Sequence, residues 1–240
     1  MIVFSCGIPK SGSTLAFQIA RAVAVLGGHP QWRLPPPLVS PGHRVNFQQV
    51  LDAGLLRQVA ERIGGRTLVI KTHDSPGLEW IAAYRDLAER GQAKALVSHR
   101  DPRDICLALL DAGRRARRRG EEAFSEFATL DGAAARVGGY LAEMERWSDL
   151  PGLLHLRYET CAFRMDEAIT AVAEHLGLRC PHWPVRFYVE RIAFTHRNKA
   201  LPERHRTELT AEQRAPLDAA FAGYLDAMGY ARHVPDAPPC

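Results

Sequence analysis

Met1-Ile2-Val3-Phe4-Ser5-Cys6-Gly7-Ile8-Pro9-Lys10-Ser11-Gly12-Ser13-Thr14-Leu15 is the segment from which the architecture of this chain is most readily inferred. Residues 1–6 form a short apolar run typical of a buried strand, and Ser13–Leu26 has the apolar spacing of a helix. Gly7 and Gly12 permit a tight turn between the two. A helix that begins there offers unpaired amide N–H groups and the positive end of its dipole to an anion. The segment therefore predicts a strand, a phosphate-binding loop and a helix.

The loop differs from the common nucleoside-triphosphate loop in the position of its lysine. Gly7 and Gly12 have the glycine spacing of G-x-x-x-x-G-K-[ST], but Ser13 follows the second glycine and Lys10 lies inside the loop. The position of the lysine disfavours an ordinary ATPase or kinase. Binding of a phosphate by the loop is still expected. Glycines that serve only a structural turn are the alternative that the loop by itself leaves open.

Length and composition place the chain among ordinary globular proteins. Its 240 residues fit one α/β domain or two small ones, and we favour a single domain over 1–240. Apolar residues make up 46% and charged residues 24%, which argues against wholesale disorder. The net charge of +4 is compatible with an anionic ligand or with nucleic acid.

No targeting, membrane or metal signal stands out in the sequence. No apolar run is long enough to span a membrane, and the start lacks the basic and long apolar regions of a secretory signal, so we expect a cytoplasmic location. The five cysteines are odd in number and widely spaced, without a C-x-x-C pair. We therefore expect neither a disulfide framework nor a metal site.

Strand-like and helix-like segments alternate along the chain. Further strands are expected at Thr67–Ile70, Ala95–Ser98 and Gly152–Tyr158. Further helices are expected at Phe47–Ile63, Gly77–Arg90, Pro102 to about Ala112, Phe124–Leu150, Phe163–Leu176 and Thr210–Met228. This order predicts an α/β fold in which helices cover both faces of a parallel sheet.

Two segments are candidates for acceptor-site or lid loops. Residues 27–46 contain Pro35-Pro36-Pro37 and paired glycines, which exclude regular structure over most of the segment; a pocket wall and a disordered or purely structural loop are equal alternatives. Residues 111–127 include the run Arg114-Arg115-Ala116-Arg117-Arg118-Arg119. This run is either a solvated basic segment or a flexible gate that attracts an anion, and no nucleic-acid-binding motif accompanies it.

Polar side chains follow each of the four expected strands. Lys10 follows the first, Lys71 and His73 the second, Arg100 the third, and Tyr158-Glu159 the fourth. Ligands of open parallel sheets bind beyond the carboxyl ends of the strands. The shared placement therefore predicts one binding site.

The residue types in these clusters suit the transfer of an anionic group. Lys71 and His73 are two residues apart, so in an extended segment both side chains point to one face. A histidine there can act as a general base, and a lysine can stabilise a leaving oxygen. Arg100 at a helix start suits a second phosphate. A solvated Lys–His loop and a surface Arg100–Asp104 ion pair are the alternatives.

Together these motifs resemble those of sulfotransferases that use 3′-phosphoadenosine 5′-phosphosulfate (PAPS). The family's 5′-phosphosulfate loop is similar to Pro9-Lys10-Ser11-Gly12-Ser13-Thr14-Leu15, and its Lys-Thr-His segment to Lys71-Thr72-His73. Its 3′-phosphate signature R-x-P-[RK]-D resembles Arg100-Asp101-Pro102-Arg103-Asp104, and its Tyr-Glu strand end resembles Tyr158-Glu159. The motifs occur in the family's order and span most of the chain.

The resemblance implies a P-loop nucleotide-hydrolase-like fold and in-line transfer of a sulfuryl group from PAPS to a hydroxyl or amine, leaving adenosine 3′,5′-bisphosphate (PAP). His73 would be the general base, with Lys10 and Lys71 stabilising the leaving group and no metal required. The residues implied in cofactor binding are Pro9, Lys10, Ser11, Gly12, Ser13, Thr14, Arg100, Tyr158, and Arg197 or Lys199.

The sequence departs from the family pattern at three places. Ala108 stands where the family commonly has a serine for the 3′-phosphate, and Leu15 stands where it often has a tryptophan. The family's basic C-terminal segment is matched only loosely by His196-Arg197-Asn198-Lys199-Ala200, so the choice between Arg197 and Lys199 stays open.

Two other functions remain as alternatives. One is a P-loop small-molecule kinase or nucleotide hydrolase, weakened by the absence of a lysine after Gly12. The other is a nucleotide-binding protein whose arginine run docks on an acidic partner. For the lead function, a small molecule, a carbohydrate or a natural product are all open as acceptors. We expect no nucleic-acid partner and no membrane span. The sequence does not indicate the oligomeric state.

Overall fold

The computed structural model describes residues 1–194 and 201–230. The chain divides into two units, which are described separately. The first comprises Met1–His99 and Glu143–Arg197, and the second comprises Arg100–Ala142 and Asn198–Cys240.

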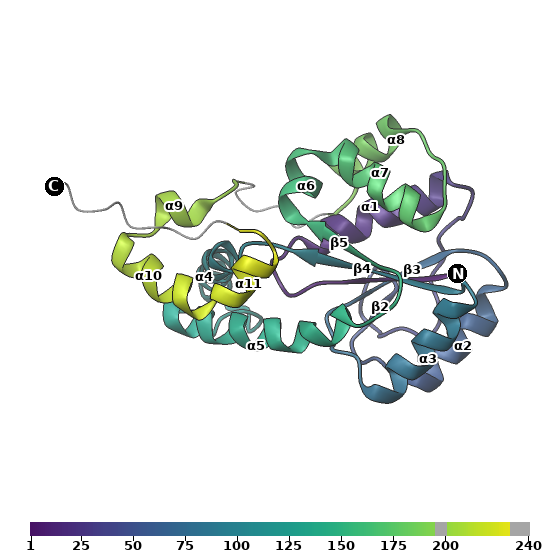
Figure 1. The fold of residues 1–240 in the computed structure, drawn as a ribbon, viewed down its shortest axis with the longest axis horizontal. Helices are drawn as coiled ribbons and strands as arrows, with labels where there is room; N and C mark the ends of the chain where they lie inside the picture. Colours follow the sequence, from purple (N-terminus) through teal and green to yellow (C-terminus); the bar gives the residue numbers. More distant parts are fainter. Residues whose placement is uncertain (195–200, 231–240) are drawn as a thin grey trace. The chain divides into compact units, whose positions relative to one another are not determined.

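The first unit is built on a five-stranded parallel sheet with strand order β2-β3-β1-β4-β5 (Figure 1). The strands are β1 (Ile2–Cys6), β2 (Phe47–Gln48), β3 (Leu68–Thr72), β4 (Ala93–His99) and β5 (Leu153–Arg157). The first strand lies in the middle because it pairs with both β3 and β4. The predicted α/β class with a parallel sheet is confirmed.

Helices cover both faces of this sheet, as the strand–helix alternation predicts. Figure 1 shows α1, α6, α7 and α8 on one face and α2 and α3 on the other. Their bounds are α1 (Ser13–Leu26), α2 (Ala53–Ile63), α3 (Leu78–Glu89), α6 (Tyr158–Phe163), α7 (Met165–Leu176), α8 (His182–Phe187) and the π-helical turn η1 (Tyr188–Ile192).

Neighbouring residues of β1 supply the two halves of the core. Val3 belongs to a buried cluster with residues of α1 and α7. Phe4 points to the opposite face, where its ring centroid lies 5.0 Å from that of Trp80. The ring centroid of Trp80 in turn lies 5.5 Å from that of Trp147. Burial on both faces makes β1 the rigid support from which the loop at residues 7–12 leaves.

The segment expected as one helix over Phe47–Ile63 is a strand followed by a shorter helix. β2 pairs with the end of β3, with Phe47 opposite Lys71. The helix begins only at Ala53, because the Asp52 side chain accepts a hydrogen bond from Leu55 N at 2.8 Å and caps it. The prediction was wrong at residues 47–52 because a two-residue strand has no periodicity to detect.

All the regular elements in the described part of the second unit are helices. They are α4 (Pro102–Arg119), α9 (Arg204–Glu208), α10 (Ala211–Ala220), α11 (Ala222–Ala227) and the first part of α5 (Leu130–Ser148). The single helix expected at Thr210–Met228 is two helices that meet at Phe221. Thr210 and Gln213 form a capping box at the start of α10.

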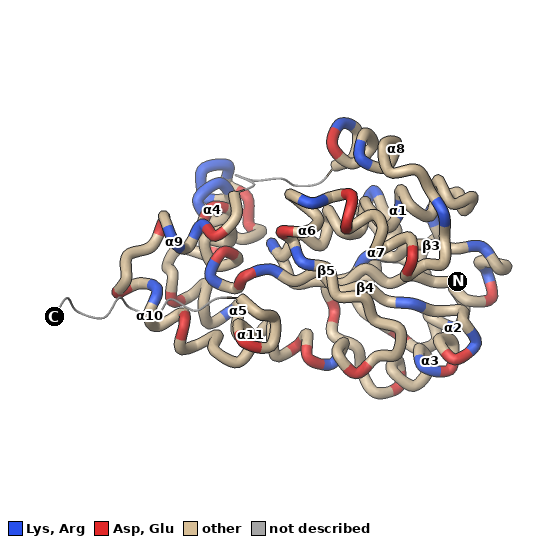
Figure 2. The backbone as a smooth tube through the Cα atoms, turned by 45° about the horizontal axis from the view of Figure 1, so that its top comes forward, with Lys and Arg blue, Asp and Glu red and all other residues tan. Residues whose placement is uncertain are grey.

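Helix α4 begins at Pro102 as predicted but ends at Arg119 rather than near Ala112. Gly113 does not end the helix; a Cβ at this position would lie 2.2 Å from Phe127 O, so the glycine allows a close backbone approach. Arg117 donates to Ser125 O and Phe127 O, at 2.7 and 3.1 Å. The segment 111–127 is therefore the end of a helix and a turn fastened to it, with the arginine run in the last helical turns (blue in Figure 2).

Candidate active site

The loop between β1 and α1 combines a tight turn with an unusual backbone conformation at Lys10. Ser11 N donates to Ile8 O at 3.1 Å, which closes the turn. Gly12 has φ 85°, which suits glycine, but Lys10 has φ 70°. A residue with a Cβ in this left-handed region costs about 1–2 kcal/mol. Lys10 is thus held in a strained conformation by its surroundings.

Both glycines of the loop lie where a side chain would collide. A Cβ on Gly12 would lie 2.6 Å from Cδ2 of Tyr158, and a Cβ on Gly7 would lie 2.0 Å from Ser98 Oγ. The alternative in which the glycines serve only a turn is thus incomplete, because both also allow close packing. Tyr158 is buried, and its ring forms one wall of the loop.

The hydroxyl of Ser11 is committed to the protein itself. Ser11 is fully buried; its Oγ donates to Ile8 O at 2.8 Å and lies 2.8 Å from Ser98 Oγ. Ser98 stands on the neighbouring strand β4. Ser11 therefore fixes the shape of the loop, and its contribution to an anion site is structural rather than through its hydroxyl.

The N-terminus of α1 has the features of an anion site. Its N-cap is Gly12, which offers no side-chain cap, and no acidic residue occupies the first turn. Leu15 N and Ala16 N bond to Gly12 O, so the amides of Ser13 and Thr14 precede the first intrahelical bonds. These N–H groups and the helix dipole favour a phosphate or sulfate oxygen.

Lys71 places a second cation at the same helix end. It follows the buried part of β3, and its Nζ donates to Thr14 Oγ1 at 2.9 Å. Burial, with a smaller effect from the charge of Lys10, lowers the pKa of Lys71 to about 8. The side chain therefore stays largely protonated at pH 7 and points to the first turn of α1.

His73 contacts the start of the loop, whereas Lys71 contacts its end. Its Nδ1 lies 2.5 Å from the carbonyl oxygen of Gly7. A carbonyl only accepts, so Nδ1 carries the proton and Nε2 keeps its lone pair in the neutral ring. Partial desolvation and then the charge of Lys71 lower the pKa of His73, against the opposing effect of the bond to Gly7. Although part of its surface is exposed, the ring is neutral at physiological pH.

Aromatic and backbone contacts position the segment that carries His73. The ring centroid of Phe47 lies 5.7 Å from that of His73, and His43 packs 4.3 Å from Phe47. Asp74 accepts Leu51 N at 2.7 Å through its side chain and Trp147 Nε1 at 3.0 Å through its carbonyl. The sequence reasoning did not identify Phe47, because it was assigned to a helix.

Arg100 belongs to the second unit, where it is buried beside Asp104. Its Nη2 lies 3.8 Å from Asp104 Oδ2, a longer separation than a hydrogen bond. Asp104 instead accepts short bonds from His205 N and Nδ1, both at 2.9 Å. Burial alone would raise the pKa of Asp104, but the bonds from His205 and the charge of Arg100 lower it. Asp104 thus anchors α9, and the expected Arg100–Asp104 ion pair is present but is long and buried rather than on the surface.

Arg103, a residue of the signature, and Arg204 of α9 form ion pairs that hold the second unit together. Arg103 is 1% exposed and bonds to Asp101 at 2.6 Å and to Asp218 at 2.5 Å. Arg204 bonds to Asp111 at 2.7 Å. Ala108, in the place of the family's serine, is buried within α4. Arg103 is therefore a structural residue of the signature rather than a free cation.

Two candidate residues cannot be placed. Arg197 and Lys199 lie outside the described residues. Pro9 lies in the turn just before Lys10, and Glu159 follows Tyr158 in the first turn of α6.

The described part of the chain contains no group of three or more His, Cys, Asp or Glu side chains arranged to hold a metal ion. In the same residues, no helix combines the length and hydropathy needed to cross a membrane.

No protein-family model matches this sequence, and no curated protein does. Solved structures do match. Mouse sulfotransferase SULT7A1 in complex with PAP has a TM-score of 0.60 at 14% identity, covering 96% of this chain and 89% of that one.

Retinol dehydratase in complex with retinol and PAP has a TM-score of 0.55 at 13% identity, covering 93% and 81% of the two chains. The sulfotransferase domain from the curacin biosynthetic pathway has 0.55 at 14% identity, covering 97% and 98%. The chain therefore has the sulfotransferase fold.

Proposed function

We propose that this protein is a PAPS-dependent sulfotransferase. One observation carries the proposal: Gly7 to Thr14 form an uncapped phosphate loop to which both a cation and a neutral imidazole are hydrogen-bonded. Lys71 bonds to Thr14 Oγ1, and His73 bonds to Gly7 O. The sulfotransferase fold of the chain and the PAP in two of the similar structures support the same assignment.

When bound, PAPS supplies the sulfuryl group and a nucleotide leaving group. Amides at the start of α1 bind the 5′-phosphosulfate oxygens, and Lys10 with Lys71 neutralises the oxygen that leaves. Arg100 binds the 3′-phosphate, helped by Arg197 or Lys199. These are proposed roles that follow the order of the sequence motifs.

His73 accepts the proton of the acceptor hydroxyl at Nε2. As the acceptor oxygen forms its bond to sulfur, the bond between sulfur and the 5′-phosphate oxygen breaks, and PAP leaves with that electron pair. The lowered pKa of His73 keeps the ring in the accepting form. Positioning and fixed charges provide the catalysis, as in phosphoryl transfer.

Thermal unfolding in the presence of nucleotides tests the proposal. We expect PAP without magnesium to raise the Tm, by an amount that grows with its concentration. ATP with magnesium should have a smaller effect, because no lysine follows Gly12. A response to ATP with magnesium and none to PAP would favour a kinase or hydrolase and would overturn the proposal.

A transfer assay then separates an enzyme from a nucleotide-binding protein. Incubation with radiolabelled PAPS and a panel of phenols, sugars and amines should yield labelled product and PAP in equal amounts. Binding of PAP without transfer to any acceptor in a broad panel would favour the binding protein.

A further inference from the structure

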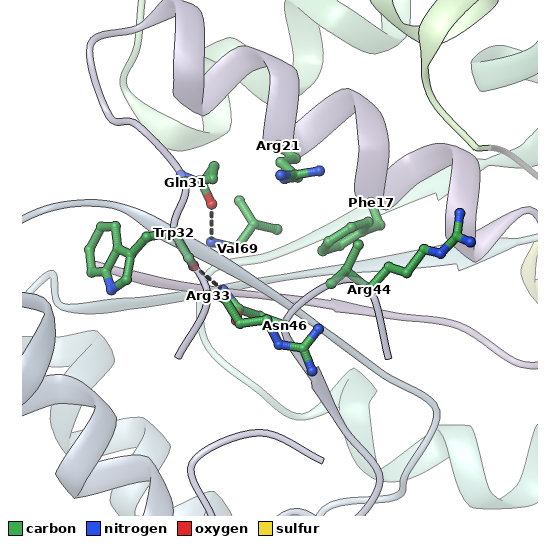
Figure 3. A pocket seen from close by; sticks show the side chains of 9 residues that line it. Phe17, Arg21, Gln31, Trp32, Arg33, Arg44, Asn46 and Val69 are labelled. Carbon is green, nitrogen blue, oxygen red and sulfur yellow. Dashed lines mark hydrogen bonds between the residues drawn. The ribbon is translucent and has the colours of Figure 1, made fainter. Parts of the chain in front are cut away.

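The first unit contains a small cavity of about 50 Å³ that the site described above does not use. The residues that line it include Phe17 and Arg21 of α1 and Trp32, Arg33 and Arg44 of the irregular segment 27–46 (Figure 3). This volume suits a few water molecules or a single small anionic group, but not a whole substrate.

The three arginines bring positive charge to the cavity without acidic partners. Arg21 donates only a long bond, 3.4 Å, to the hydroxyl of Tyr188. Within residues 1–194 and 201–230, the ion pairs involve none of Arg21, Arg33 and Arg44, and other arginines, such as Arg90, do have acidic partners. A guanidinium group without a carboxylate partner attracts carboxylate, sulfate or phosphate.

The side-chain amides of Gln31 and Asn46 hold the cavity wall in place. Gln31 donates to Thr67 O at 2.8 Å and accepts from Val69 N at 2.9 Å, so it occupies the edge of β3 as a strand would. Asn46 is 7% exposed; it accepts from Leu34 N at 2.9 Å and donates to Trp32 O at 2.8 Å. These bonds fix the backbone of the cavity wall, which reduces the entropy lost on binding, whereas the side chains of Arg33 and Arg44 are exposed.

The same wall continues into the candidate active site. Asn46 O accepts the backbone N–H of Lys71 at 2.8 Å, and the next residue, Phe47, packs on His73. Val69 lines the cavity and is two residues from Lys71 on the same face of β3. At about 3.3 Å per residue, Val69 and His73 are about 13 Å apart along the chain.

We propose that this cavity is a subsite that binds an anionic group of the acceptor. The acceptor would carry a carboxylate, sulfate or phosphate on the order of 10 Å from the hydroxyl that attacks. This inference rests on the proposed sulfotransferase function, because it places the second group relative to His73. Phe17 and Val69 provide an apolar wall for the connecting part of the acceptor.

Kinetics with matched acceptors test the proposal. A series of 4-hydroxyphenyl-alkanoic acids with short, medium and long chains is compared with the methyl esters. We expect kcat/KM of the longer acids to exceed that of their esters by about 10-fold, since a charge-assisted hydrogen bond is lost in the ester.

Arg33→Gln and Arg44→Gln should reduce this acid preference to about 1 without changing the rate with esters. Arg57→Gln, an exposed arginine on α2 outside the cavity, is the control and should retain the preference. Equal rates for acids and esters in the unmodified protein, or variants that slow both alike, would overturn the subsite.

A binding measurement keeps the subsite separate from the transfer reaction. Inorganic sulfate should change the fluorescence of Trp32 in a saturable way, with the Trp32→Phe protein as the blank. The change should disappear in Arg33→Gln/Arg44→Gln and persist in Lys10→Ala, which alters the phosphate loop. Persistence of the change in the double arginine variant would overturn the subsite, whereas a normal sulfate response with no transfer to any acceptor would overturn only the proposed function.

Discussion

His73 shows how a single hydrogen bond determines what a side chain can do. Because Gly7 O can only accept, the bond to Nδ1 fixes both the tautomer and the orientation of the ring. The loop that would bind the anion therefore also aligns the group that would accept a proton. Phe47 limits rotation of the same ring from the side.

Replacement of this histidine should reduce turnover much more than binding. We expect His73→Ala to lower kcat by about 10²–10⁴-fold, the usual contribution of a general base. The affinity for PAP, measured by calorimetry, should stay within a few-fold, since the loop amides remain. His182→Ala, at a half-exposed histidine on α8, serves as the control. Retention of full activity in His73→Ala would exclude the role.

The pH dependence of kcat/KM should reflect the lowered pKa of His73. Protonation of Nε2 abolishes its function as a base, so activity should decline on the acid side with an apparent pKa below the ordinary value of about 6.5. Lys71→Met removes a nearby positive charge and should move this limb to higher pH. An acid limb above 6.5 in the unmodified protein would contradict the assignment.

At the scale of elements, the loop at residues 7–12 is shaped by the strands and helices that pack around it. β1 fixes its start, the ring of Tyr158 fills the space beside Gly12, and Ser98 of β4 holds Ser11. The loop therefore depends on three strands or helices that are distant in sequence. Its stability is a property of their packing rather than of the glycines alone.

A pair of glycine substitutions can separate backbone strain from this packing. Gly12 and Gly28 both have positive φ, 85° and 90°, but a Cβ on Gly28 would contact nothing within 4 Å. Gly28→Ala should cost about 1 kcal/mol from backbone strain alone. Gly12→Ala should cost about 1–3 kcal/mol more, from the collision with Tyr158.

Denaturant unfolding measures both costs, and a double-mutant cycle with Tyr158→Ala should recover most of the difference. Equal costs at Gly12 and Gly28 would show that the packing against Tyr158 is unimportant.

The parallel sheet was predictable because its signals are local, and the candidate site residues could be named for the same reason. Val3, Val69 and Leu96 lie in apolar runs, and the polar residues that follow each run are covalently fixed to the end of a strand. In contrast, β2 is too short for a pattern, and the second part of α4 was missed because Gly113 suggests an end. The role of Gly113 is defined by its close approach to the carbonyl oxygens of Phe124 and Phe127, which a local sequence pattern does not reveal.

The cavity residues could not be predicted for a similar reason. Arg33 and Arg44 sit in a proline-rich segment without periodicity, and only the hydrogen bonds of Gln31 and Asn46 to β3 and to that segment define their positions. An amide in a loop sequence does not reveal which backbone groups it will bind.

At the scale of the whole molecule, burial lowers the pKa of four histidines in the described part of the chain, which are His73, His99, His155 and His175. The pKa of His99 is lowered to about 4, chiefly by burial and then by the neighbouring His155 and Arg157. His99 is 4% exposed, and its Nε2 lies 2.8 Å from Nδ1 of His155. Between two neutral rings one nitrogen donates and the other accepts, so protonation of the acceptor breaks the bond.

Stability should therefore depend on pH in the weakly acidic range. Because the folded pKa of His99 lies below the unfolded value of about 6.5, the unfolded chain binds more protons between pH 6.5 and about 4. The contribution of His99 is complete above pH 6.5 and is lost as pH falls through this window. We expect a loss of up to about 3 kcal/mol in the free energy of unfolding.

Guanidinium unfolding at pH 7.5 and pH 5, compared between the unmodified protein and His99→Gln, checks this expectation. The glutamine variant should lose less stability on acidification, and His182→Gln should behave like the unmodified protein. An equal loss in all three would assign the acid sensitivity to other groups.

The left-handed conformation of Lys10 lowers thermal stability at a residue that the proposed activity requires. A glycine at this position would adopt the same φ without a Cβ penalty, so the protein forgoes about 1–2 kcal/mol by keeping a lysine there. Selection of variants for heat resistance alone would then favour loss of the cation that the proposed chemistry needs. Mutagenesis libraries screened only for a high Tm should be enriched in inactive proteins with Lys10 replaced, which is the trade-off expected of a strained functional residue.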